Sequence, residues 1–125
     1  MAPYTALLDA CVLVPIALAD TLLRVAEREL YRPIWSDRII GEAADAVLEI
    51  HADLEPDVVA KRFAAMNDTF KDASVEGWDI FEGTIALPDP DDRHVVAAAM
   101  RGGADAIVTA NVPDFPSETL GPLEI

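Results

Sequence analysis

The segment from residue 87 to residue 115 constrains the fold of this chain more than any other. It reads LPDPDDRHVVAAAMRGGADAIVTANVPDF, which is an acidic turn, an apolar helix, a Gly-Gly stop, a short uncharged strand and an Asn/Asp loop. Asp91 or Asp92 can cap the helix, which runs to Arg101 before the two glycines end it. A helix that leads into a buried strand predicts a parallel α/β sheet.

The rest of the chain repeats this alternation of strands and helices. We expect helices from the cap Asp20 to about Leu30, from Ser36 or Asp37 to Ile50, and from Pro56 to Met66. We expect strands at residues 5–8, 33–35 and 106–109, a weak one at 75–81, and an edge strand at 123–125. The fold class is therefore α/β, with a central, mostly parallel sheet of four to five strands in a three-layer α/β/α arrangement. Residues 1–125 suit a single domain.

The charge balance limits the partners that the chain can have. There are 23 Asp and Glu residues against 9 Lys and Arg, which gives a net charge of −14. Such a surface repels phosphate backbones, so a nucleic-acid role must depend on metal ions or a local basic patch, and a basic partner is equally natural. The single cysteine, Cys11, excludes an internal disulfide and a Cys-based zinc site. Asp9 interrupts the one early apolar stretch, so we expect no signal peptide, no membrane span and a cytoplasmic location.

Acidic and amide side chains from four segments are predicted to meet at one edge of the sheet. Parallel strands end at the same edge, crossover helices begin there, and ligands bind there in such folds. Asp9 follows the first strand, Glu42 lies early in its helix, Asp92 lies at a helix start, and Asn111 and Asp114 follow the last clear strand. Carboxylates that share a site repel one another, and a divalent cation relieves that repulsion. Hard oxygen ligands favour Mg²⁺ or Mn²⁺, which suits a metal-dependent phosphodiesterase.

Each of these residues also has a plain structural interpretation. Among 23 acids, several must fall at helix starts and strand ends by chance. Aspartate is a good N-cap without any further role, and Asn111 suits a turn. Glu42 alone is typical of a solvated helix residue. The functional interpretation depends on the joint placement of the four segments.

The motifs resemble those of the PIN domain, the ribonuclease fold of VapC-type toxins. The resemblance is greatest to the branch with a D-P-D-D-R-H phrase, here residues 89–94, and a T-x-N-x-x-D-F phrase, here residues 109–115. The opening LLDACVL at residues 7–13 and the WSD at residues 35–37, followed by Glu42, resemble the family's first two acidic segments. The similarity spans nearly the whole chain. It implies a PIN-like nuclease domain and metal-dependent cleavage of RNA.

The resemblance also implies roles for individual residues. Asp9, Glu42 and Asp92 would form the main cage for Mg²⁺ or Mn²⁺, and Asp114 would be the fourth acid. Supporting roles fall to Asn111, which would orient a ligand or water, to Thr109, which would hydrogen-bond the first acid, and to Asp89 and Asp91. Many members carry an acid where Asn111 stands. The implied partners are an antitoxin protein and a second copy of the chain, and members of this branch often have a C-terminal extension.

Four further residues are candidates for contact with RNA. Arg24, Arg28 and Arg32 follow one another at four-residue spacing and would form one basic stripe, or would pair with the neighbouring Glu27 and Glu29. His94 could approach the substrate, although an exposed helix residue is the favoured interpretation.

Two other functions remain open. A PIN-like fold that scaffolds a partner without cutting agrees with the strong negative charge and the few basic residues. A phosphoacceptor domain similar to response-regulator receivers agrees with the length and the fold class. That chemistry needs a lysine after a late strand, and both lysines, Lys61 and Lys71, precede the strand at residues 106–109.

Overall fold

The centre of the fold is a short parallel sheet. The structure is a computed structural model that describes residues 4–116. Strand β1 (Thr5–Leu8) lies in the middle, with β2 (Arg32–Ile34) and β3 (Ala106–Val108) paired in parallel on either side of it. All four residues of β1 are buried, as expected for a central strand covered on both faces. The described residues therefore confirm a parallel sheet, but with three strands instead of four to five.

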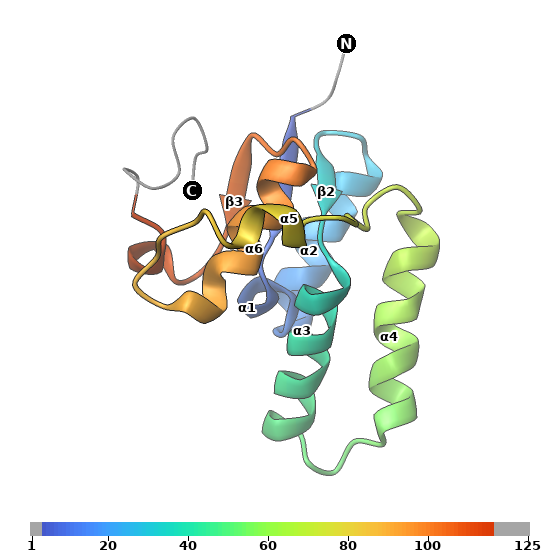
Figure 1. Cartoon of the computed structure of the whole chain (residues 1–125). Coiled ribbons are helices and arrows are strands. Elements are labelled where there is room, and N and C mark those ends of the chain that lie inside the picture. Colours follow the sequence, from blue (N-terminus) through green and yellow to red (C-terminus); the bar gives the residue numbers. More distant parts are fainter. Residues whose placement is uncertain (1–3, 117–125) are drawn as a thin grey trace.

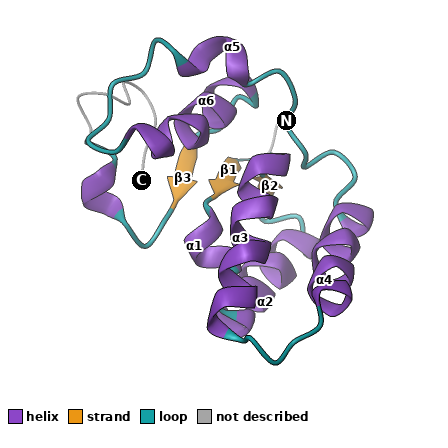
Figure 2. Cartoon of the chain, turned by 60° about the horizontal axis from the view of Figure 1, so that its bottom comes forward, coloured by secondary structure: helices purple, strands orange, loops and turns teal. Residues whose placement is uncertain are grey.

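Helices cover the sheet in two groups. Helices α1 (Ala10–Leu13) and α2 (Ile16–Glu27) connect β1 to β2. The connection from β2 to β3 contains α3 (Asp37–Ile50), α4 (Pro56–Thr69), α5 (Asp79–Glu82), the 3₁₀ turn η1 (Pro90–Asp92) and α6 (Arg93–Arg101). The second connection divides between the two groups, because α3 contacts α1 and α4, whereas α5 and α6 pack against each other. The α/β class is thus confirmed, and the strands lie among helices with α5 and α6 grouped apart from α1–α4 (Figure 2).

The strands all run toward the same edge, where the functional residues are expected. In Figure 1 the three arrows point the same way, and the α3–α4 hairpin extends beyond their carboxyl ends. Two of the predicted helix starts are present: the Ser36 hydroxyl accepts a hydrogen bond from Ile39 N at 3.2 Å, and Pro56 is the first residue of α4. The Ser36 cap and Pro56 fix where α3 and α4 begin.

The helix expected at residues 20–30 is displaced toward the N-terminus. It begins at Ile16, after Pro15, because the apolar run from Ile16 to Ala19 is itself helical. Asp20 is therefore not a cap but an internal residue that pairs with Arg24 at 2.8 Å. The helix ends at Glu27, and Glu29 has a φ of 61°, a left-handed conformation that a helix cannot continue.

The prediction of a weak strand at residues 75–81 is wrong. A single parallel bridge joins Trp35 to Ser74, and the chain then turns at Gly77, whose φ is 74°. Residues 79–82 form the helical turn α5. The strand expected at residues 123–125 lies outside the described residues.

The end of α6 packs tightly against the core. Gly102 lies so close to β2 that a Cβ there would be 2.6 Å from Ile34 Cδ1. Gly103 then takes a φ of 68°, so the two glycines end the helix as predicted. None of the helices in residues 4–116 is long and apolar enough to cross a membrane.

Candidate active site at the carboxyl edge of the sheet

Asp9 is held in place at the junction of β1 and α1. Its carboxylate accepts hydrogen bonds from Ala10 N at 2.8 Å and from the Thr109 hydroxyl at 3.0 Å. Its own backbone N–H donates to Val108 O at 3.0 Å. The residue is only 7% exposed. The end of β3 thus fixes the acid that follows β1, and the hydrogen bond predicted for Thr109 is confirmed.

Asp92 stands at the start of α6 but does not cap it. Its side chain makes no capping hydrogen bond, whereas Asp89 accepts a hydrogen bond from Asp91 N at 2.9 Å and caps η1. Burial raises the pKa of Asp92 to about 6, and the charges of Asp89, Asp9, Asp114 and Asp91 add to the rise. The plain capping role therefore belongs to Asp89, which leaves the Asp92 carboxylate available for another role.

Glu42 lies in the second turn of α3 and faces α6. Its Oε1 is 2.9 Å from Nε2 of His94. Burial raises the pKa of Glu42, and the charges of Asp9, Asp92 and Asp91 raise it further, while Arg38 opposes the rise. The structure therefore brings Glu42 into the same electrostatic neighbourhood as the acids that follow β1 and precede α6.

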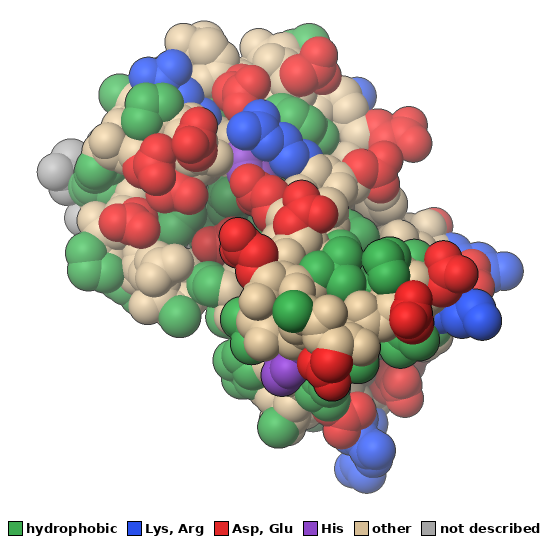
Figure 3. Space-filling view, turned by 90° about the horizontal axis from the view of Figure 1, so that it is seen from below, with side chains coloured by type: hydrophobic (Ala, Val, Ile, Leu, Met, Phe, Trp, Pro, Cys, Tyr) green, Lys and Arg blue, Asp and Glu red, His purple; other side chains and the backbone are tan. Residues whose placement is uncertain are grey.

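Asp114 and Asn111 lie on the loop after β3. Asp114 belongs to the 3₁₀ turn η2 (Val112–Asp114) and is half-buried, and its charge raises the pKa of Asp92. Asn111 is exposed, and its backbone N–H donates to Thr109 Oγ1 at 3.0 Å. Figure 3, seen from below, looks onto this edge and shows Asp and Glu side chains gathered around its recessed centre.

The four acids are electrostatically coupled, but they do not form a finished metal site. Within residues 4–116, no three His, Cys, Asp or Glu side chains converge closely enough to hold a metal ion as they stand. Their donor type is nevertheless the hard oxygen that Mg²⁺ and Mn²⁺ prefer. Burial is the main cause of the raised pKa values of Glu42 and Asp92, and neighbouring acids add a repulsion that a cation would relieve. In chemistry and charge, these residues fit a hard divalent cation.

His94 is not the exposed residue that the sequence suggested. Its side chain is completely buried, so it cannot contact RNA from this position. Burial lowers its pKa to about 4, and the charge of Arg38 lowers it further, so the ring is neutral at pH 7. The pattern of a histidine followed by Val95-Val96 and three alanines was the available signal that it belongs to the buried face of α6.

The three arginines do not form one helical stripe. Helix α2 ends at Glu27, so Arg28 follows the helix and Arg32 belongs to β2. Arg24 pairs with Asp20, and Arg32 donates to Asp72 O at 3.1 Å. Because Arg32 is the first residue of β2, it lies at the opposite end of the sheet from the acids. Contacts between these arginines and RNA stay a prediction.

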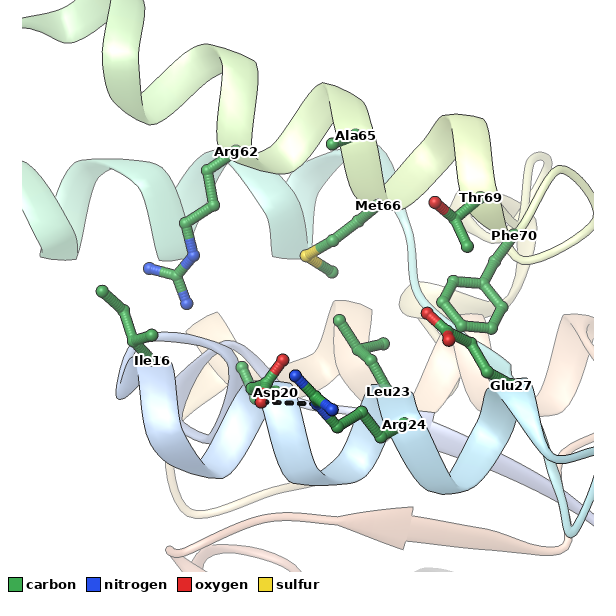
Figure 4. Close-up of a pocket in the computed structure, with 11 residues that line it drawn as sticks. Ile16, Asp20, Leu23, Arg24, Glu27, Arg62, Ala65, Met66, Thr69 and Phe70 are labelled. Atoms are coloured by element: carbon green, nitrogen blue, oxygen red, sulfur yellow. Dashed lines mark hydrogen bonds and ion pairs between the residues drawn. The ribbon is translucent and has the colours of Figure 1, made fainter.

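A concave surface that the sequence did not predict lies between α2 and α4. This groove has a volume of about 420 Å³, and none of the four acids lines it. Figure 4 shows Asp20, Leu23 and Arg24 of α2 across from Arg62 and Met66 of α4. The acidic edge and this groove are thus separate features of the molecule.

Comparison with known proteins gives the family. The family model described as PIN domain matches residues 5–113, most of the chain. The chain therefore belongs to the PIN domain family. A protein of Mycobacterium tuberculosis named "Putative ribonuclease VapC50" is 53% identical over 34 residues. That stretch is 27% of this chain and only 20% of the relative. No solved structure matches.

Proposed function

We propose that this chain is a metal-dependent endoribonuclease that hydrolyses RNA phosphodiester bonds. The observation that carries the proposal is the shared acidic edge, where Asp9, Asp92 and Asp114 come from segments far apart in sequence. Their charges act on one another, and the pKa of Asp92 rises to about 6. Clustered carboxylates with a strongly shifted pKa are typical of functional sites. Membership of the PIN domain family and the name of the mycobacterial relative agree with a ribonuclease.

Mg²⁺ or Mn²⁺ would be held by Asp9, Glu42, Asp92 and Asp114. When bound, such an ion activates water for attack and neutralises charge on the phosphodiester. Asp9 is fixed for this role by its hydrogen bonds to Ala10 N and Thr109 Oγ1. Asn111, exposed at the same edge, would orient a water or a substrate oxygen.

The biological context that we propose is a type II toxin–antitoxin pair in the cytoplasm. The chain would be the toxin, with RNA as substrate, an antitoxin protein as partner and a homodimer as its working form. The basis is the resemblance of the motifs to those of VapC-type toxins, together with the net charge of −14, which favours a basic partner. The same charge explains why RNA would need bound cations to approach the acidic edge.

Substitution of the central acids tests the activity. We expect Asp9→Asn and Asp92→Asn each to lower the rate of RNA cleavage in Mg²⁺ by about a hundredfold or more, because a lost charge-stabilising contact in a transition state costs about 10²–10³ in rate. Asp53→Asn is the matched control, since Asp53 is an exposed acid in the α3–α4 connection. RNA cleavage at the wild-type rate by the Asp9→Asn, Asp92→Asn double variant would contradict the proposal.

A second candidate is a PIN-like module that binds a partner without cutting. It is favoured by the absence, among residues 4–116, of three acidic or histidine side chains that already converge on one point. Calorimetry separates the two functions. The nuclease binds Mg²⁺ or Mn²⁺ at millimolar concentration, whereas the scaffold shows no heat of binding.

A further inference from the structure

The feature that the proposed chemistry does not use is the buried imidazole of His94. It is the second residue of α6, its side chain is completely buried, and its ring lies 6.0 Å from that of Trp78. Valines and alanines fill the following positions of the helix. An apolar residue would fill this space without the cost of burying two ring nitrogens.

Both ring nitrogens lack a well-formed hydrogen bond within the part of the chain that the structure describes. Nε2 is nevertheless 2.9 Å from Glu42 Oε1, which is a hydrogen-bonding distance with poor alignment. The distance is the more informative of the two observations, because the Glu42 side chain is 41% exposed and can change its orientation without a movement of either helix. A buried imidazole without well-formed hydrogen bonds calls for an explanation, and a role at the adjacent acidic edge provides one.

The cationic side chain nearest along the helix, Arg38, pairs with an acid other than Glu42. Arg38 precedes Glu42 by one turn of α3, but its guanidinium contacts Glu82 at 3.2 Å. No hydrogen bond or ion pair between Arg38 and Glu42 is found among the described residues. Among the described residues, His94 is therefore the side chain that makes an ion-pair contact with Glu42.

We propose that His94 is a positioning residue, which donates Nε2–H to Glu42 Oε1 and so directs the other carboxylate oxygen toward the shared site of Asp9 and Asp92. This inference rests on the proposed function, because it assigns Glu42 to the metal cage. A histidine that orients a carboxylate ligand acts through that ligand, and the loss of such a support weakens metal binding by about 10–100-fold.

Metal affinity without substrate provides the test. We expect His94→Leu to weaken Mn²⁺ binding, measured by titration calorimetry, by about 10–100-fold. His94→Gln keeps an N–H donor in the chain and should recover most of the affinity. His51→Leu is the matched control, since His51 is the other histidine of the chain and is exposed. Melting curves of each variant show that the fold is retained, and His94→Met replaces His94→Leu if the latter does not fold.

The pair can also be tested by a double-mutant cycle. In a Glu42→Gln background, His94→Leu should change the Mn²⁺ affinity no further, because its effect passes through the Glu42 carboxylate. A wild-type protein that binds no Mn²⁺ overturns the proposed function together with this inference. A wild-type protein that binds Mn²⁺, with His94→Leu binding it equally well, overturns the positioning role alone.

Discussion

At the scale of single residues, Asp92 and His94 respond to pH in opposite directions. Burial and four nearby acids raise the pKa of Asp92 from 3.8 to about 6, so between these values the folded state keeps a proton that the unfolded state has released. The contribution of Asp92 to stability therefore falls as the pH rises through this window. Burial lowers the pKa of His94 from 6.5 to about 4, so its contribution rises with pH over nearly the same range.

Because the pH-dependent contributions of Asp92 and His94 to stability oppose each other in the wild type, single variants are needed to measure each contribution. In EDTA, the melting temperature of Asp92→Asn should gain on that of the wild type as the pH rises from about 4 to about 6, and the difference should then stay constant. For His94→Leu, the melting temperature relative to wild type should fall over the same interval. Thermal denaturation followed by circular dichroism measures both. Variant curves that run parallel to the wild type would contradict the shifted pKa values.

At the scale of elements, the end of α6 is fixed by close packing on β2. A Cβ at Gly102 would lie 2.6 Å from Ile34 Cδ1 and 2.9 Å from Val75 Cγ2, both in the core. We expect Gly102→Ala to lower the free energy of unfolding by about 1–3 kcal/mol through overpacking. Gly41→Ala is the control, because Gly41 lies within α3 with nothing within 4 Å of its Cβ position. That change should be neutral or raise stability by up to about 1 kcal/mol. Urea denaturation measures both, and equal effects would refute this account of α6.

Helix α1 is only one turn long and depends on α4 for support. The Arg62 guanidinium donates to Leu13 O and to Val14 O, the second at 3.3 Å, at the opposite end of α1 from Asp9. Arg62→Met keeps much of the side-chain volume but leaves these carbonyls without their partner, so we expect a loss of about 1–3 kcal/mol in stability. Lys61→Met, at an exposed neighbouring position, should change stability by less than about 0.5 kcal/mol. Chemical denaturation would show whether the two variants differ.

Local sequence signals predicted some elements well and others poorly. The Ser36 cap and Pro56 set the starts of α3 and α4, because capping and proline geometry act within a few residues. The start of α2 was misplaced because Asp20 suits a cap equally well as an i, i+4 partner of Arg24. Residues 75–81 have strand-like composition, but the left-handed Gly77 interrupts them. Strand propensity cannot show such a turn.

At the scale of the whole molecule, the excess negative charge predicts how cations affect stability. If Mg²⁺ binds the acidic edge, it stabilises the folded state by mass action, in addition to screening the net charge of −14. We expect millimolar Mg²⁺ to raise the melting temperature more than NaCl at equal ionic strength. Differential scanning calorimetry gives the comparison, and the excess should disappear in Asp9→Asn. An effect of Mg²⁺ that NaCl reproduces would indicate screening alone.

The placement of the site followed from topology, but its internal contacts did not. Parallel strand order alone predicts that Asp9, Asp92 and Asp114 meet at one edge, and the effect of the Asp9 and Asp114 charges on the pKa of Asp92 agrees with that. The hydrogen bond of Thr109 is predicted by the family resemblance. The contact of His94 with Glu42 joins residues that are distant in sequence and depends on how α6 packs against α3, which no local pattern encodes.

The central position of β1 has a consequence for synthesis of the protein. Asp9 is made early, but the hydroxyl that holds it belongs to Thr109, and Asp114 follows later still. A nascent chain that has folded only through α4 has neither. The proposed nuclease site can therefore be completed only after residues 109–114 have been synthesised, which is late in translation of this sequence.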